Sequence, residues 1–195
     1  MTKTAATTAL QDKQQDFLAT DMIKIAGFFW QICLLRASPS QIPGNPVVLG
    51  AVLGTYCLTA LLALAVTRTN HTMLSILGIV LVGVLIQGSL VFALLAFKRL
   101  GQRFYATWSA LLGANTIMLV ILLPINVIIA DGEAGSLRVI ADSISWVCLG
   151  WWFAIGGFIF HKATNISILQ GSAIAFMMEL LGVLATVSLF PPVTA

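Results

Sequence analysis

The stretch MLSILGIVLVGVLIQGSLVFALLAF, Met73 to Phe97, runs without a single charged side chain. A bilayer core of about 30 Å needs roughly 20 apolar residues in a helix, so this stretch is long enough to cross it. The apolar run is continuous rather than alternating, which favours a helix over a membrane strand. It therefore predicts a transmembrane helix over residues 73–97.

Four similar stretches lie on either side of this one, and none has a Lys or Arg in its interior. They are residues 46–67, 104–130, 142–160 and 168–190. The connections between the five stretches are short, which favours antiparallel neighbours in a compact bundle. We therefore expect an all-α polytopic membrane protein whose five-helix transmembrane domain spans residues 46–195.

The composition agrees with this expectation. Hydrophobic residues make up 59% of the 195 residues and charged residues only 9%, whereas soluble domains carry about 25% charged residues. This composition excludes a water-soluble enzyme, a nucleic-acid-binding module and a disordered segment. Cys33, Cys57 and Cys148 lie in apolar stretches without a CxxC spacing, so we expect reduced, buried thiols.

The first 45 residues differ from the rest of the chain. Residues 1–15 form a polar tail, 16–36 an apolar segment, and 37–45 a Pro-rich linker that turns into the first span. Within residues 16–36 the polar positions share one helical stripe; they are Asp16, Thr20, Lys24, Gly27 and Gln31. This pattern predicts an amphipathic helix in the membrane interface, with Trp30 at the head groups. A sixth span is the alternative.

The distribution of Lys and Arg predicts the orientation. With the N-terminus inside, eight of these residues fall on that side and two on the other. The eight are Lys3, Lys13, Lys24, Arg36, Lys98, Arg99, Arg103 and Lys162, and the two are Arg68 and Arg138. We therefore expect a cytoplasmic N-terminus and a periplasmic C-terminus in a bacterial inner membrane.

Glu179 is the one ionisable acid or base deep inside a predicted span. It shares a stripe of small and polar residues with Gly171, Ala175, Gly182 and Thr186. Because small residues permit close approach, this stripe is predicted to face other helices, with Gly171, Ala175 and Gly182 as packing positions. Gly50 and Gly54 form a GxxxG on the first span, and this motif packs helices within a bundle or between two copies.

Depth arithmetic suggests partners for the carboxyl of Glu179. Tyr56, Gln87 and Asn115 lie near the centres of the first three spans, and Trp151 and Trp152 mark the same level on the fourth. We therefore predict a buried polar cluster of Glu179, Gln87, Asn115 and Tyr56. It is either interhelical glue, worth about 1 kcal/mol, or a site for a proton, an ion or a ligand.

Lys98, Arg99 and Arg103 form a basic corner on the predicted cytoplasmic side. It is either a positive-inside anchor alone or also a contact for anionic lipid head groups. No HExxH, GxSxG, P-loop or dinucleotide fingerprint is present, and His71 and His161 fall at opposite membrane ends. We therefore expect no enzyme activity, no metal and no cofactor.

The layout resembles that of the Yip1-type membrane proteins, most closely their short bacterial members. The shared features are a cytoplasmic N-terminal segment, five closely spaced spans and the Pro-rich turn RASPSQIPGNPVVLG, Arg36 to Gly50. The Asp-Leu-Tyr-Gly-Pro-type motif of the eukaryotic members is absent, so the resemblance implies neither vesicle trafficking nor a small-GTPase partner.

The first functional hypothesis is a non-enzymatic membrane protein that organises membrane lipids or other membrane proteins, or self-associates, without nucleic acid. The alternatives are a transporter or channel component using the Glu179 cluster, and an accessory subunit of a membrane enzyme complex. Five spans leave no equal inverted repeat, which argues against a stand-alone secondary transporter.

Overall fold

The computed structural model describes residues 25–67, 72–130 and 135–190, and regular structure in these ranges is helical. The elements are η1 (Pro39–Gln41), α2 (Pro46–Thr67), α3 (Met73–Phe97), η2 (Gly101–Arg103), α4 (Phe104–Ala130), α5 (Ser136–Thr164) and α6 (Ile168–Leu189). Helices α2 to α6 are each long and apolar enough to cross a membrane. The predicted all-α polytopic bundle is therefore confirmed, and the chain is a multi-pass membrane protein.

Helix α5 extends beyond the stretch expected from the sequence. It runs from Ser136 to Thr164, whereas the apolar run suggested only 142–160. Charged residues near both ends limited the apolar run, but a helix continues until its backbone is stopped. That stop is Asn165, which occupies the C-cap position in a left-handed conformation (φ 59°).

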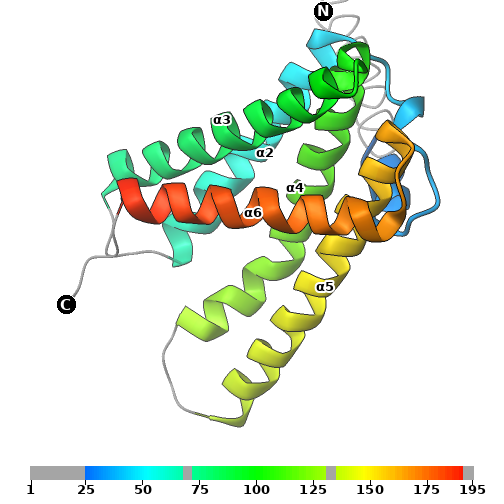
Figure 1. Ribbon diagram of the computed structural model, residues 1–195. Helices are drawn as coiled ribbons and strands as arrows, with labels where there is room; N and C mark the ends of the chain where they lie inside the picture. The colour runs from blue at the N-terminus through cyan, green and yellow to red at the C-terminus, as the bar shows by residue number, and fades with distance from the viewer. Residues whose placement is uncertain (1–24, 68–71, 131–134, 191–195) are drawn as a thin grey trace, which may run out of the picture.

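The five long helices form two arms that meet near one end of the molecule (Figure 1). The first arm contains α2, α3 and α6, with α3 and α6 side by side, and the second contains α4 and α5. Helix α2 packs on α4, and α5 packs on α6. The C-terminal half of α4 and the N-terminal half of α5 then run away from the first arm (Figure 1).

Burial along α4 and α5 follows this divergence. The buried residues of α4 lie between Thr107 and Met118, with none in the last three turns. In α5 they lie at Cys148 and beyond, apart from Ala141. The tightly packed core therefore lies in the half of the bundle where the arms meet, and the diverging halves of α4 and α5 contribute little to it.

Helices α5 and α6 approach each other through glycines. A Cβ atom on Gly171 would lie 2.5 Å from the carbonyl oxygen of Gly157, and one on Gly156 would lie 2.8 Å from the Cβ of Ala175. Ser172 adds a hydrogen bond from its Oγ to the carbonyl of Phe153 (2.9 Å). Small residues thus permit backbone contact between two membrane helices, where packing takes over from the hydrophobic effect.

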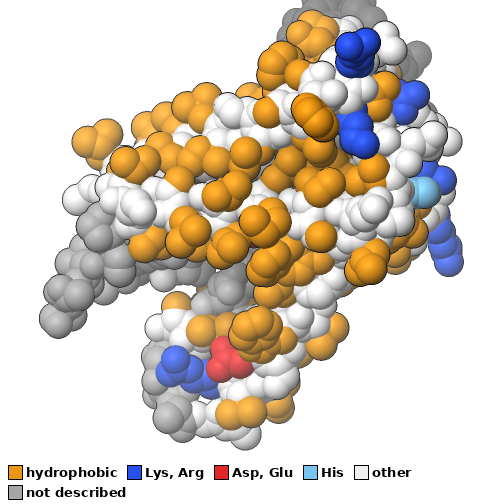
Figure 2. Space-filling view, in the orientation of Figure 1, with side chains coloured by type: hydrophobic (Ala, Val, Ile, Leu, Met, Phe, Trp, Pro, Cys, Tyr) orange, Lys and Arg blue, Asp and Glu red, His pale blue; other side chains and the backbone are white. Residues whose placement is uncertain are grey.

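The outer surface of the α3–α6 face is strongly apolar. Figure 2 shows hydrophobic side chains over most of this face. The exposed leucines of the two helices include Leu81 and Leu85 on α3 and Leu180 and Leu184 on α6, each at least 40% exposed. Such side chains suit contact with lipid chains.

The end of the N-terminal segment packs onto the bundle. Residues 25–33 are helical, and Phe29, Ile32 and Cys33 are buried. The indole Nε1 of Trp151 donates a hydrogen bond to the carbonyl of Cys33 (2.9 Å). Gly27 and Gln31 of the predicted polar stripe are exposed, whereas residues 16–24 and the polar tail lie outside the described residues, so the interfacial placement stays a prediction.

Candidate functional site

A cavity of about 600 Å³ lies between the two arms, and all five long helices contribute to its wall. Its polar lining residues are Tyr56 and Thr67 from α2, Gln87 from α3, Asn115 and Asn126 from α4, Ser145 from α5, and Glu179 and Thr186 from α6. The other lining residues are mostly apolar. The four residues of the predicted polar cluster thus share the wall of one cavity.

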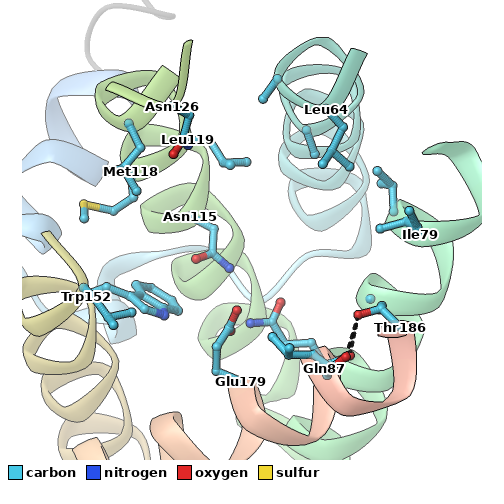
Figure 3. Close-up of a pocket in the computed structure, with 18 of the residues that line it drawn as sticks. Leu64, Ile79, Gln87, Asn115, Met118, Leu119, Asn126, Trp152, Glu179 and Thr186 are labelled. Carbon is cyan, nitrogen blue, oxygen red and sulfur yellow. Dashed lines mark hydrogen bonds between the residues drawn. The ribbon is translucent and has the colours of Figure 1, made fainter. Parts of the chain in front are cut away.

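Three of these four side chains converge in the close-up view. The carboxyl of Glu179 and the amides of Gln87 and Asn115 point toward one another from three helices (Figure 3). The fourth, Tyr56, lines the same cavity from α2. In sequence these residues are far apart, and they meet because each lies near the middle of its helix.

The converging groups line the cavity without hydrogen bonds between them. Within the described residues, no hydrogen bond involves the side chains of Glu179, Gln87 or Asn115. The polar side-chain atoms of Gln87 and Asn115 are not among the fully enclosed, unpaired ones of the described residues, which are Trp108 Nε1 and Ser109 Oγ, and Glu179 is exposed. Their donors and acceptors are therefore accessible from the cavity.

The cavity extends from this central group toward one end of the bundle. Thr67 lies eleven residues beyond Tyr56, and Asn126 eleven residues beyond Asn115, which is about 16 Å along each helix. Thr67 is the last residue of α2. Because Asn126 and Thr186 line the cavity too, polar groups continue from the centre to the end where the arms are apart.

This end is opposite the basic corner. Arg138 lies near the start of α5, whereas Figure 2 shows several Lys and Arg side chains together at the other end of the molecule, where α3 is followed by η2. There the Arg103 guanidinium donates to the carbonyl of Ala163 (2.9 Å) near the C-terminal end of α5, a favourable position for a cation. Lys98 and Arg99 are exposed, so head-group contact by these two residues stays a prediction, while Arg103 also has a structural partner.

The predicted packing residues fall into three groups. Gly171 and Ala175 pack against α5 as described above. Gly182 lines the cavity between the helices, and a Cβ at this position would meet no atom within 4 Å, so its role as a packing position stays a prediction. Gly50 and Gly54 likewise meet nothing within 4 Å, so among the described residues they pack no neighbouring helix.

Sequence reasoning missed several wall residues. Trp152 served only as a depth marker, and Trp146, Ser145 and Asn126 were not singled out, yet all four line the cavity. A signal for them exists in helical spacing. Asn115 and Asn126 are three turns apart, and Ser145 and Trp152 two turns apart, so each pair lies on one face of its helix.

No protein-family model, no curated protein and no solved structure matches this chain. The expected Yip1-type membership therefore rests on the layout and on the Pro-rich turn between Arg36 and Gly50, and it stays a prediction.

Proposed function

We propose that the protein is a transporter or channel component that admits a small solute to Glu179 in the middle of the membrane. The observation that carries this proposal is the cavity itself: one carboxyl and two amides from three helices face a space of about 600 Å³. Volumes between about 300 and 1,000 Å³ are typical of small-molecule sites.

Interhelical glue is the competing interpretation of Glu179. A carboxyl that only holds helices together is expected to hydrogen-bond across a closed interface. Among the described residues the Glu179 carboxyl makes no such bond, and it faces the cavity. A carboxyl in the middle of a span is costly to keep, and such groups usually face a bundle interior or a water-filled cavity on a solute pathway. This cost favours a role in function.

Proton flux through reconstituted protein tests this function. The proteoliposomes hold a pH-sensitive dye, which reports the internal pH. After acid is added outside, we expect the internal pH to fall several-fold faster with the wild-type chain than with Glu179→Gln, since the amide cannot carry the proton. Asp142→Asn is the matched control, because Asp142 is exposed on α5 and does not line the cavity. Equal proton flux through the wild type and Glu179→Gln would contradict the proposal, provided that both proteins elute as folded protein in size-exclusion chromatography.

The organiser hypothesis remains as a second candidate, because one observation favours it. Gly50 and Gly54 are exposed on the outer side of α2 with nothing within 4 Å, which leaves a GxxxG face for another membrane protein or a second copy. Under this proposal the protein is a non-enzymatic Yip1-like protein of the bacterial inner membrane that binds lipids and membrane-protein partners. If proteins that co-purify with the full chain are lost when residues 1–24 are removed, this result would favour the organiser hypothesis. The deletion leaves the buried Phe29 and Cys33 in place.

A further inference from the structure

The charged side chains in the wall of the cavity favour a cation as the ligand. Among the described residues that line it, Glu179 is the one with a carboxylate side chain, and none is Lys, Arg or His. The basic corner around Lys98 and Arg99 lies toward the opposite end, and Arg138 near the start of α5 does not line the cavity. In a medium of low dielectric, a carboxylate without a cationic partner favours a positively charged ligand over a negatively charged one.

The wall also offers aromatic faces beside this charge. Trp152 and Trp146 reach the cavity from α5, and Tyr56 reaches it from α2. Figure 3 shows the Trp152 ring on the side of the cavity opposite Gln87, facing the Glu179 carboxyl. Aromatic faces attract ammonium groups, with Trp the most favourable, and this attraction increases when the cation is desolvated.

The size and the composition of the cavity argue against a bare metal ion. A hard cation needs about six oxygen ligands at close range, whereas the central group offers one carboxyl, two amides and a phenol in a space of about 600 Å³. Most of the remaining wall is apolar, including Met118, Leu119 and Leu122. This combination suits a molecule with one positive charge and an apolar body.

We infer that the cavity binds a small organic cation, an ammonium compound with alkyl or aromatic substituents. Glu179 pairs with the charge, Trp152 and Tyr56 contact the ammonium substituents, and Gln87 and Asn115 accept hydrogen bonds from any N–H group. The inference rests on the proposed function, because it names the solute class for the same cavity.

Equilibrium binding of benzyltrimethylammonium to the protein in nanodiscs tests the inference. Its uncharged carbon isostere, neopentylbenzene, has the same shape without the charge. We expect the cation to change the intrinsic tryptophan fluorescence in a saturable way, and the isostere to compete at least about tenfold more weakly. Protein-free nanodiscs correct for partition into lipid.

Variants assign the binding to named side chains. We expect Glu179→Gln to weaken binding at least about tenfold, and Glu179→Asp to recover part of the loss because it restores the charge. Binding should fall more for Trp152→Leu than for Trp152→Phe, which keeps an aromatic face. Asp142→Asn, outside the cavity, should bind like the wild type.

The outcomes of the flux and binding experiments distinguish the organic-cation ligand from the proposed transport function. Glu179-dependent proton flux without cation binding, or with equal binding of the isostere, overturns the organic cation and leaves the transport function in place. Absence of both flux and binding overturns both. Cation binding that Glu179→Gln leaves unchanged in a folded variant also overturns the inference, since the pairing charge is then not the recognised feature.

Discussion

Gly171→Leu is expected to separate α5 from α6 and lower the free energy of unfolding by about 3 kcal/mol or more, the upper range for overpacked positions. A Cβ at Gly171 would lie 2.5 Å from the carbonyl oxygen of Gly157. Backbone cannot rotate aside as a side chain can, so the helices must move apart. The measurement is denaturant-induced unfolding of the protein in detergent micelles, followed by circular dichroism.

Gly182→Leu provides the control for this prediction on the same helix. No atom lies within 4 Å of a Cβ built at Gly182, so the leucine enters open space and replaces a poor helix former by a good one. We expect its free energy of unfolding to stay within about 1 kcal/mol of the wild type. Equal destabilisation by both variants would show that the contact between Gly171 and Gly157 is not what holds α5 and α6 together.

The same Gly182→Leu variant is expected to abolish solute passage while the protein remains folded. Gly182 lines the cavity one turn from Glu179, so the leucine side chain extends into the space through which a solute reaches the carboxyl. In proteoliposomes, proton flux should fall to that of the Glu179→Gln variant. The cation should likewise fail to change the tryptophan fluorescence.

The outcome of this second prediction depends on where solute travels. Leu184→Ala is its counterpart, because Leu184 is 55% exposed on the apolar outer surface and does not line the cavity. We expect Leu184→Ala to leave flux unchanged. Wild-type flux through folded Gly182→Leu would mean that the cavity between the arms is not the pathway.

The helices were predictable from the sequence because apolar length is a local property of the chain. The runs at 46–67, 73–97 and 104–130 coincide with α2, α3 and α4. The ends of α5 were not predictable in this way, because capping by Asn165 rather than hydropathy ends this helix.

The site was predictable to the extent that depth in the bilayer is set by position along a helix. Depth placed Glu179, Gln87, Asn115 and Tyr56 at one level, and they share one cavity. The cavity itself depends on how far two arms diverge, which is a tertiary property. A small-residue stripe cannot reveal that Gly171 meets backbone while Gly182 meets open space.

Water access to the cavity is the central claim, and cysteine accessibility in intact membranes tests it most directly. In a variant whose Cys33, Cys57 and Cys148 are replaced by alanine, Gly182→Cys places a thiol in the cavity, and Leu184→Cys places one at a similar depth on the apolar outer surface. Lys98→Cys marks the basic side.

A membrane-impermeant maleimide reacts with thiolate, which forms only where water reaches the sulfur. The account predicts that Gly182→Cys is labelled from the side opposite Lys98→Cys, and that Leu184→Cys is not labelled. Equal labelling of Gly182→Cys and Leu184→Cys, or labelling of neither, would contradict it.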